Sequence, residues 1–211
     1  MNGVACKLCG SVSVQAFRVR ERMYVRCRDC DLIVVPDEFH VSPQDEMARY
    51  RLHENTLSNE GYVRMFREKI ALIKGYCPGI RSVLDYGCGP QPVLAELLRR
   101  EGYSADAYDP YFFPEKPDEA YDLVMSTEVF EHFRDVRAGI NGIRECVKDG
   151  GFLAVMTAFH DAVADFNSWW YITDPTHICF YGMRTFGRIS REFGFSIVFT
   201  DRKNFIILRK R

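Results

Sequence analysis

One stretch, VLDYGCGPQPVLAELL at residues 83–98, constrains the fold of this chain more than any other. It opens with a short apolar run that suits a buried strand, and then breaks at the GCGP sequence of residues 87–90. Apolar residues afterwards recur at the spacing of one helix face. Pro92 suits the first turn of such a helix, where its missing N–H is not needed, and Gly102 marks the end. The stretch therefore predicts a strand, a tight glycine turn and a helix.

Strand and helix patterns alternate along the rest of the chain. Apolar runs predict strands at residues 103–109, 121–126 and 152–159. Apolar residues at helical spacing predict helices over residues 44–76, 135–151 and 183–194. The last two apolar runs, 195–200 and 204–210, are joined by only a short turn, so these strands must be antiparallel at the edge of the sheet. The pattern predicts a doubly wound α/β sheet, mostly parallel, with an antiparallel last strand.

Four of the eight cysteines fall into two close pairs near the N-terminus, with the spacing C-x2-C-x17-C-x2-C. This spacing is typical of zinc sites, because two intervening residues let a tight turn aim both thiolates at one tetrahedral ion. Alternating apolar residues between the pairs predict a short hairpin. Four unrelated cysteines or a redox pair are the alternatives. We expect a zinc ribbon over residues 1–36, with a structural Zn²⁺ held by Cys6, Cys9, Cys27 and Cys30.

Composition and charge narrow the classes of protein to which the chain can belong. The formal net charge is −1 over 211 residues, which argues against a strongly electrostatic nucleic-acid binder. Residues 1–35 carry six basic and three acidic side chains, an excess that permits contact with an anionic substrate or RNA but also fits a solvated hairpin face. No apolar run approaches the roughly 20 residues of a membrane span, and no signal-peptide pattern opens the sequence. We therefore expect a cytoplasmic protein.

The glycine turn predicts a ligand that contains a ribose. Asp109 stands 22 residues after Gly87, at the end of the next expected strand, where an acid can accept hydrogen bonds from both ribose hydroxyls. The turn lacks the third glycine of G-x-G-x-x-G, which suits a pyrophosphate, and the G-K-[ST] of a phosphate loop. S-adenosylmethionine contains a ribose and has no pyrophosphate or triphosphate, so it fits this turn.

Several motifs together resemble class I S-adenosylmethionine-dependent methyltransferases. VLDYGCGPQ is similar to their first motif, AYDP to their ribose-binding acid, YDLVMSTEVFEHF to their fourth strand with its EVxEH continuation, and VKDGGFLAVMT to the step into their fifth strand. The resemblance covers about residues 60–211 and implies a seven-stranded type of sheet. The motifs ARYRLHEN and DPTHICFY also resemble bacterial proteins that carry an N-terminal ribbon. The cofactor contacts implied by the resemblance are Asp85, Tyr86, Gly87, Cys88, Gly89, Asp109, Pro110, Thr127 and Glu128.

One segment departs from the family pattern. Only about a dozen residues separate Asp109 from Tyr121, where most family members place a helix and a further strand that contacts adenine. We expect the sheet to be one strand short on this side. Adenine would then lie against Tyr111 or Phe112, unless these two aromatic side chains only fill the gap.

Three histidines are candidate catalytic residues. A sulfonium carries an excellent leaving group, so the enzyme must mainly align the acceptor and exclude water, and a base is needed only when the acceptor is protonated. His132 follows the fourth strand of the family at the ligand-binding edge, His177 lies in the loop before the final strands, and His53 lies in the helical lead-in. The alternatives are structural: a hydrogen-bonded histidine at 132, and a loop contact with Asp174 at 177.

The aromatic segment NSWWYITDPTHICFY suits a lid over the substrate. Within it, Trp169, Trp170 and Tyr171 could stack on a flat acceptor or pack the lid onto the core.

The sequence divides into the ribbon (1–36), a helical lead-in or lid (37–76) and a cofactor-binding domain (77–211). The predicted activity is methyl transfer from S-adenosylmethionine, with S-adenosylhomocysteine as product, to a small-molecule acceptor. An RNA methyltransferase that grips RNA through the ribbon, and a non-catalytic binding protein, are the alternatives.

Overall fold

A six-stranded, mostly parallel sheet forms the centre of the computed structural model, which describes residues 5–52 and 55–211. Its strand order is β5-β4-β6-β7-β10-β9, in which β5, β4, β6 and β7 are parallel neighbours. Strand β10 is antiparallel to both β7 and β9, as the short final turn predicts. The bounds are β4 (Ser82–Tyr86), β5 (Ser104–Tyr108), β6 (Tyr121–Thr127), β7 (Val147–Met156), β9 (Phe195–Thr200) and β10 (Phe205–Lys210).

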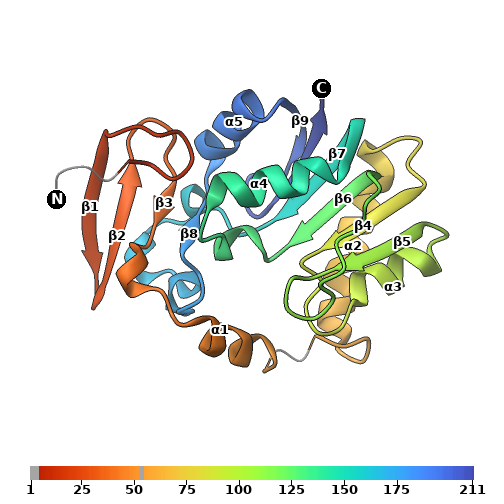
Figure 1. The fold of residues 1–211 in the computed structure, drawn as a ribbon, viewed down its shortest axis with the longest axis horizontal. Coiled ribbons are helices and arrows are strands. Elements are labelled where there is room, and N and C mark those ends of the chain that lie inside the picture. Colours follow the sequence, from red (N-terminus) through yellow and green to blue (C-terminus); the bar gives the residue numbers. More distant parts are fainter. Residues whose placement is uncertain (1–4, 53–54) are drawn as a thin grey trace.

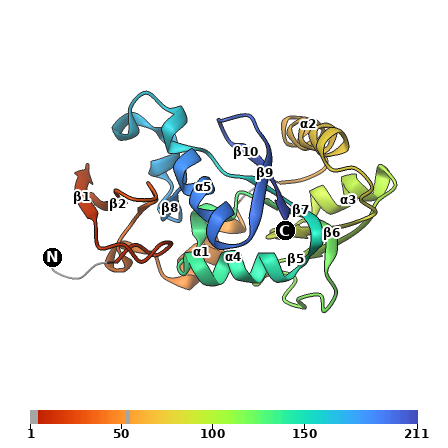
Figure 2. The same ribbon diagram turned by 90° about the horizontal axis from the view of Figure 1, so that it is seen from above.

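Helices cover both faces of this sheet (Figures 1 and 2). Side chains alternate between the faces along each strand, so Val83 and Leu123 pack with α2 (Glu60–Tyr76) and α3 (Val93–Arg100). Their neighbours Leu84 and Val124 pack on the opposite side with α4 (Val136–Glu145) and α5 (Met183–Glu192). The doubly wound α/β prediction is therefore confirmed. None of the helices in the described residues is long and apolar enough to cross a membrane.

A second, smaller sheet lies beside the first and contains the N-terminal hairpin (Figure 1). Strands β1 (Val14–Val19) and β2 (Arg22–Cys27) pair antiparallel, as the alternating pattern predicts. The order continues through β3 (Ile33–Val34) to β8 (Cys179–Phe180), which comes from the second half of the chain. The buried side chains of the hairpin and of α4 and α5 belong to one continuous hydrophobic cluster.

Two expected helices have different bounds in the structure. The helix expected over 44–76 is divided into α1 (Pro43–Tyr50) and α2, because the Asn59 side chain caps a new helix by accepting a hydrogen bond from the Tyr62 N–H. The helix expected over 135–151 ends at Glu145, and β7 begins at Val147. The prediction that Gly150 and Gly151 close a helix is wrong. A Cβ at Gly151 would lie 3.0 Å from the Asp122 carbonyl oxygen, so glycine permits close approach of β7 to β6.

The segment between β5 and β6 carries no further strand of the central sheet, so β5 is its edge. Asp109 and Phe113 form only an isolated antiparallel bridge to each other, which turns the chain back toward β6. The expectation that the sheet is one strand short on this side is confirmed.

Candidate active site and cysteine cluster

A cavity of about 710 Å³ lies at the carboxyl ends of β4, β5 and β6. Ligands bind at this edge in open parallel sheets, because the loops that follow the strands diverge there. The cavity is also lined by residues of α1, α2 and the loop before β8. It is lined by all nine residues of the expected cofactor site: Asp85, Tyr86, Gly87, Cys88, Gly89, Asp109, Pro110, Thr127 and Glu128.

The glycine turn brings main chain directly to the cavity. Gly87 has φ +84° and donates its N–H to the Tyr108 carbonyl at 2.7 Å, which joins the turn to β5. A Cβ at Gly87 would lie 2.3 Å from the Val129 Cγ2 atom. A Cβ at Gly89, whose φ is +67°, would have no other side chain or main-chain atom within 4 Å. Gly87 is therefore required by both its conformation and its neighbour, and Gly89 by its conformation.

Asp85, at the end of β4, is almost fully buried. Its carboxylate accepts a hydrogen bond from the Ala95 N–H at the start of α3, at 3.3 Å. Burial raises the pKa of Asp85 to about 7, and the negative charge of Asp109 acts in the same direction. The hydrogen bond from the Ala95 N–H and the positive charge of Arg99 lower the pKa of Asp85, but by less than burial raises it.

Asp109 follows β5, and backbone groups fix its buried side chain in the wall of the cavity. One carboxylate oxygen accepts the N–H groups of Tyr111 and Phe112 at 2.9 and 3.1 Å. The other accepts the Gly89 N–H at 3.0 Å. Tyr111 lines the cavity, whereas Phe112 is not among the lining residues of the described chain. Of the two expected adenine neighbours, the structure therefore brings only Tyr111 to the cavity.

The histidines at 132 and 177 lie together at the other end of the cavity, with ring centroids 5.0 Å apart. The Nδ1 of His132 is 2.9 Å from the Thr176 carbonyl oxygen, and that of His177 is 2.8 Å from the Tyr171 carbonyl oxygen. A carbonyl only accepts, so each Nδ1 carries the proton and each Nε2 keeps a lone pair when the ring is neutral. Burial lowers the pKa of His177, which favours the neutral ring. The third candidate, His53, lies outside the described residues.

Glu131 and its contact with Tyr171 were not among the sequence predictions. Glu131 is fully buried behind the two histidines and accepts a hydrogen bond from the Tyr171 hydroxyl at 2.5 Å. Glu128 Oε2 lies 3.2 Å from the same hydroxyl. Burial, together with the negative charge of Glu131, raises the pKa of Glu128 well above its usual range. The sequence signal for this pair is the spacing of Glu128 and Glu131, two acids three positions apart directly after a strand.

The aromatic segment after β7 contributes both to the core and to the cavity. Trp169 is buried and stacks on Tyr171, with ring centroids 5.0 Å apart. Trp170 is 70% exposed and lines the cavity, as does Tyr171. Trp169 therefore packs into the core, whereas Trp170 and Tyr171 reach the cavity.

Helix α1 lies over the cavity between His132, which contacts the ring of Tyr50, and Tyr111, whose hydroxyl reaches Glu46 at 3.4 Å. Glu46 on this helix is buried, accepts the Tyr50 hydroxyl at 2.7 Å and pairs with Arg134 at 2.9 Å. Arg49 pairs with Asp174 at 2.8 Å, which connects α1 to the loop that carries His177. These contacts hold α1 over the cavity.

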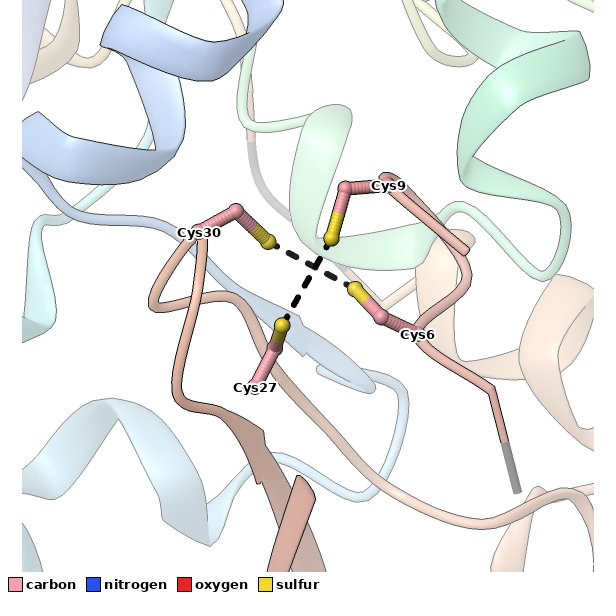
Figure 3. A group of neighbouring side chains, drawn as sticks. All are labelled: Cys6, Cys9, Cys27 and Cys30. Atoms are coloured by element: carbon pink, nitrogen blue, oxygen red, sulfur yellow. Dashed lines mark hydrogen bonds between the residues drawn. The ribbon is translucent and has the colours of Figure 1, made fainter. Parts of the chain in front are cut away.

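The four paired cysteines converge on one point, as Figure 3 shows. The Sγ atoms of Cys6 and Cys30 are 3.5 Å apart, and those of Cys9 and Cys27 are 3.6 Å apart. These distances exclude disulfides, whose sulfurs lie about 2 Å apart. A tetrahedral zinc ion with bonds of about 2.3 Å separates its sulfur ligands by about 3.8 Å. The cluster therefore fits the ion predicted from the cysteine spacing.

The strands next to this cluster contact the loop that carries His177. Arg22 on β2 donates to the carbonyl oxygens of Asp174 and Pro175, at 3.1 and 2.8 Å. The ring of Tyr24 packs against Phe180 on β8, with centroids 5.9 Å apart. The hairpin is thus part of the support of the cavity.

Comparison with known proteins assigns this chain to a family. A family described as a methyltransferase domain matches residues 53–199. A solved structure of Burkholderia thailandensis 1,6-didemethyltoxoflavin-N1-methyltransferase, with its substrate and S-adenosylhomocysteine bound, is similar with a TM-score of 0.58 and 14% identity, over 93% of this chain and 99% of that one. An S-adenosylmethionine-dependent methyltransferase from Archaeoglobus fulgidus has a TM-score of 0.53 and 18% identity, over 70% and 94%.

A third structure extends beyond the present chain. It is an O-methyltransferase family protein from Burkholderia thailandensis, with a TM-score of 0.54 and 17% identity. The match covers 79% of this chain, which spans 62% of the length of that protein. No curated protein sequence matches this chain. At these identities the solved structures support the fold, which agrees with the six-stranded sheet.

We predict that Gly87→Ala destabilises the protein more than Gly79→Ala does. Both residues have positive φ, but the space around a Cβ is open at Gly79 and blocked by Val129 at Gly87. The backbone conformation costs about 1–2 kcal/mol at either position, and the clash adds about 1–3 kcal/mol at Gly87. Urea denaturation of both variants measures the difference. Adding Val129→Ala to Gly87→Ala should restore part of the loss, and equal losses in the two single variants would contradict the close contact.

Proposed function

Because this chain belongs to the family of methyltransferase domains, we propose that it transfers a methyl group from S-adenosylmethionine to a small-molecule acceptor. The observation that carries this proposal is the joint position of the glycine turn and Asp109 at one end of a cavity that has two histidines at the other end. A cavity of about 710 Å³ has room for a nucleoside-sized cofactor together with a small acceptor.

The residues present fit the cofactor along the cavity. Asp109 would accept the ribose hydroxyls, and Tyr111 would lie against the adenine. The main chain at residues 87–89 can approach the ligand closely because two of these residues are glycines. Asp85 would receive the ammonium group of the methionine part, with Thr127 and Glu128 beside it. Tyr86, Cys88 and Pro110 would complete the cofactor site.

The acceptor would occupy the end formed by His132, His177 and the helix α1. Bound S-adenosylmethionine supplies a methyl group on a sulfonium, which leaves as the thioether of S-adenosylhomocysteine. The protein must therefore hold the acceptor in line with the methyl carbon and keep water out. The Nε2 lone pairs of the two histidines and the negative charge of Glu131 favour loss of a proton from the acceptor. The Glu46–Arg134 and Arg49–Asp174 pairs keep α1 over this end.

The contacts of the N-terminal hairpin favour a small acceptor over RNA. Lys7 pairs with Asp37, Arg22 binds carbonyl oxygens of the acceptor loop, and Arg26 pairs with Asp31. These cations are used within the protein, which leaves less positive charge for a phosphate backbone. We therefore propose that the ribbon, residues 1–36, supports the acceptor loop, with residues 37–76 as lid and 77–211 as the cofactor-binding domain.

We predict that Asp109→Ala weakens binding of S-adenosylmethionine and S-adenosylhomocysteine by about 10–100-fold, the loss expected for hydrogen bonds to a charged carboxylate. Calorimetric titration of both ligands measures this effect. Asp106→Ala is the matched control, because Asp106 lies on β5, three residues before Asp109, and contacts Tyr121 rather than the cavity. Absence of binding to the folded wild-type protein would favour a non-catalytic binding protein.

Binding of the cofactor should strengthen as pH rises from 6 to 7.5. Asp85 has a raised pKa of about 7 in the free protein, so its carboxylate gains charge over this range. An ionised Asp85 attracts the ammonium group, whereas a protonated one does not. In the Asp85→Asn variant this rise should disappear, as measured by titration at several pH values. A rise of equal size in the variant would show that another group is responsible.

The four cysteines should bind one zinc ion per chain. Substitution Cys9→Ser or removal of zinc with a chelator should lower the melting temperature, because the ribbon packs on the core of the protein through its metal-dependent fold. Metal analysis and thermal unfolding measure the two effects. Cys146→Ser, which changes a buried cysteine outside the cluster, should keep its zinc, and full zinc content in Cys9→Ser would contradict the proposed site.

A further inference from the structure

Three side chains that can bind a metal ion meet at the acceptor end of the cavity, far in sequence from the cysteine cluster. They are Glu131, His132 and His177, and one ligand atom from each lies within 4.8 Å of the other two. Glu131 and His132 are adjacent in a short turn after β6, and His177 comes from the loop before β8. Ligand atoms that share one ion at bonds of about 2.1 Å lie about 3–4 Å apart, so this group is of the size that one ion needs.

The two histidines are held as metal ligands usually are. Each donates its Nδ1–H to a main-chain carbonyl, of Thr176 for His132 and of Tyr171 for His177. Such an outer hydrogen bond fixes the tautomer and the ring orientation of a ligating histidine and raises its basicity. The remaining Nε2 atom of each ring is then the only nitrogen with a lone pair to offer.

The carboxyl group of Glu131 provides a second, independent observation. This side chain is fully buried, and its Oε2 atom has no hydrogen-bond partner within residues 5–52 and 55–211. Its Oε1 atom accepts from Tyr171, and the carboxyl group of Glu128, whose pKa is raised, lies within hydrogen-bond reach of the Glu131 carboxyl group. The nearby cations of the described residues pair elsewhere, Arg134 with Glu46 and Lys69 with Asp201. A buried carboxylate with an unpartnered oxygen is costly unless a cation lies beside it.

We infer that Glu131, His132 and His177 form a binding site for one divalent transition-metal ion. Two imidazoles and one carboxylate on one side of an ion are typical of iron, manganese, cobalt and zinc sites with open coordination positions. His132 and His177 line the cavity, whereas Glu131 lies behind them, so the open positions face the acceptor. The four-thiolate cluster selects softer ions and has no open position.

This site deepens the proposed function and rests on it for the role of the metal. An acceptor with a hydroxyl next to a second oxygen would bind the ion through both oxygens. With the ion bound, the Nε2 lone pairs of His132 and His177 bind the metal and do not act as bases. The ion lowers the pKa of the hydroxyl, whose proton passes to solvent as the acceptor binds, before water is excluded. The ionised oxygen then bonds to the methyl carbon as the carbon–sulfur bond breaks, and that electron pair stays on the sulfur. The inferred acceptor class is therefore a vicinal diol, a catechol or a hydroxycarbonyl compound.

Manganese binding to the zinc-replete full chain tests the site without any need for the acceptor. Mn²⁺ added alone should bind with one ion per chain, seen as loss of the electron paramagnetic resonance signal of free Mn²⁺. Glu131→Gln and His177→Gln should each weaken this binding by at least about 10–100-fold, because loss of even an outer hydrogen bond to a metal ligand lowers metal affinity by that factor. His40→Gln is the matched control, because His40 contacts the Val35 carbonyl outside the cluster.

The outcomes separate this inference from the proposed function. Unchanged Mn²⁺ affinity in Asp109→Ala, with S-adenosylhomocysteine binding retained in Glu131→Gln, would support a metal site independent of the cofactor site. A folded wild-type protein that binds no Mn²⁺ would overturn the inference, as would equal affinity in Glu131→Gln. Loss of Mn²⁺ binding in Cys9→Ser but not in Glu131→Gln would assign the ion to the cysteine cluster and also overturn it.

Discussion

The contact on which the cavity most depends is the pairing of β3 with β8. Ile33 and Phe180 are partners in this pairing, and the hydrogen bonds continue beyond it. Ile178 accepts the Val35 N–H and donates its own N–H to the Glu131 carbonyl, both at 2.8 Å. One short ladder therefore joins the N-terminal ribbon, the loop before β8 and the turn after β6. Because His177 precedes Ile178 and His132 follows Glu131, this ladder sets the distance between the two histidines.

The histidine end of the cavity concentrates ionisable groups where burial makes their charge costly. Glu131 and Tyr171 are buried, whereas Glu128 is exposed where it lines the cavity, and the Tyr171 hydroxyl lies within hydrogen-bond distance of both carboxyl groups. Burial raises the pKa of both Glu128 and Tyr171 well above their usual ranges. Glu128 also has φ +54°, an uncommon conformation for a residue with a side chain. Such arrangements reduce stability and are typical of functional sites, where geometry is held by the surrounding core.

The lead-in helix and the ribbon act on the same loop from different sides. Arg49 of α1 binds the Asp174 carboxylate, and Arg22 of β2 binds the Asp174 carbonyl oxygen. The loop that carries His177 is therefore held between two segments that precede the glycine turn in the chain. A change in either segment can move the histidine end of the cavity while the glycine turn and Asp109, which directly follow strands of the central sheet, keep their positions.

The sequence by itself determined the features that depend on local geometry. Glycine at 87 permits a positive φ, apolar spacing at 93–98 forms one helix face, and two-residue spacing between cysteines places thiolates together. It could also predict the missing strand, because a dozen residues cannot hold a helix and a strand. The tertiary structure alone decided where Glu131 and Tyr171 lie, that Trp169 is buried beside the exposed Trp170, and that β8 joins the ribbon. Those contacts join residues tens of positions apart, and their distances depend on how the two sheets pack, which no local pattern specifies.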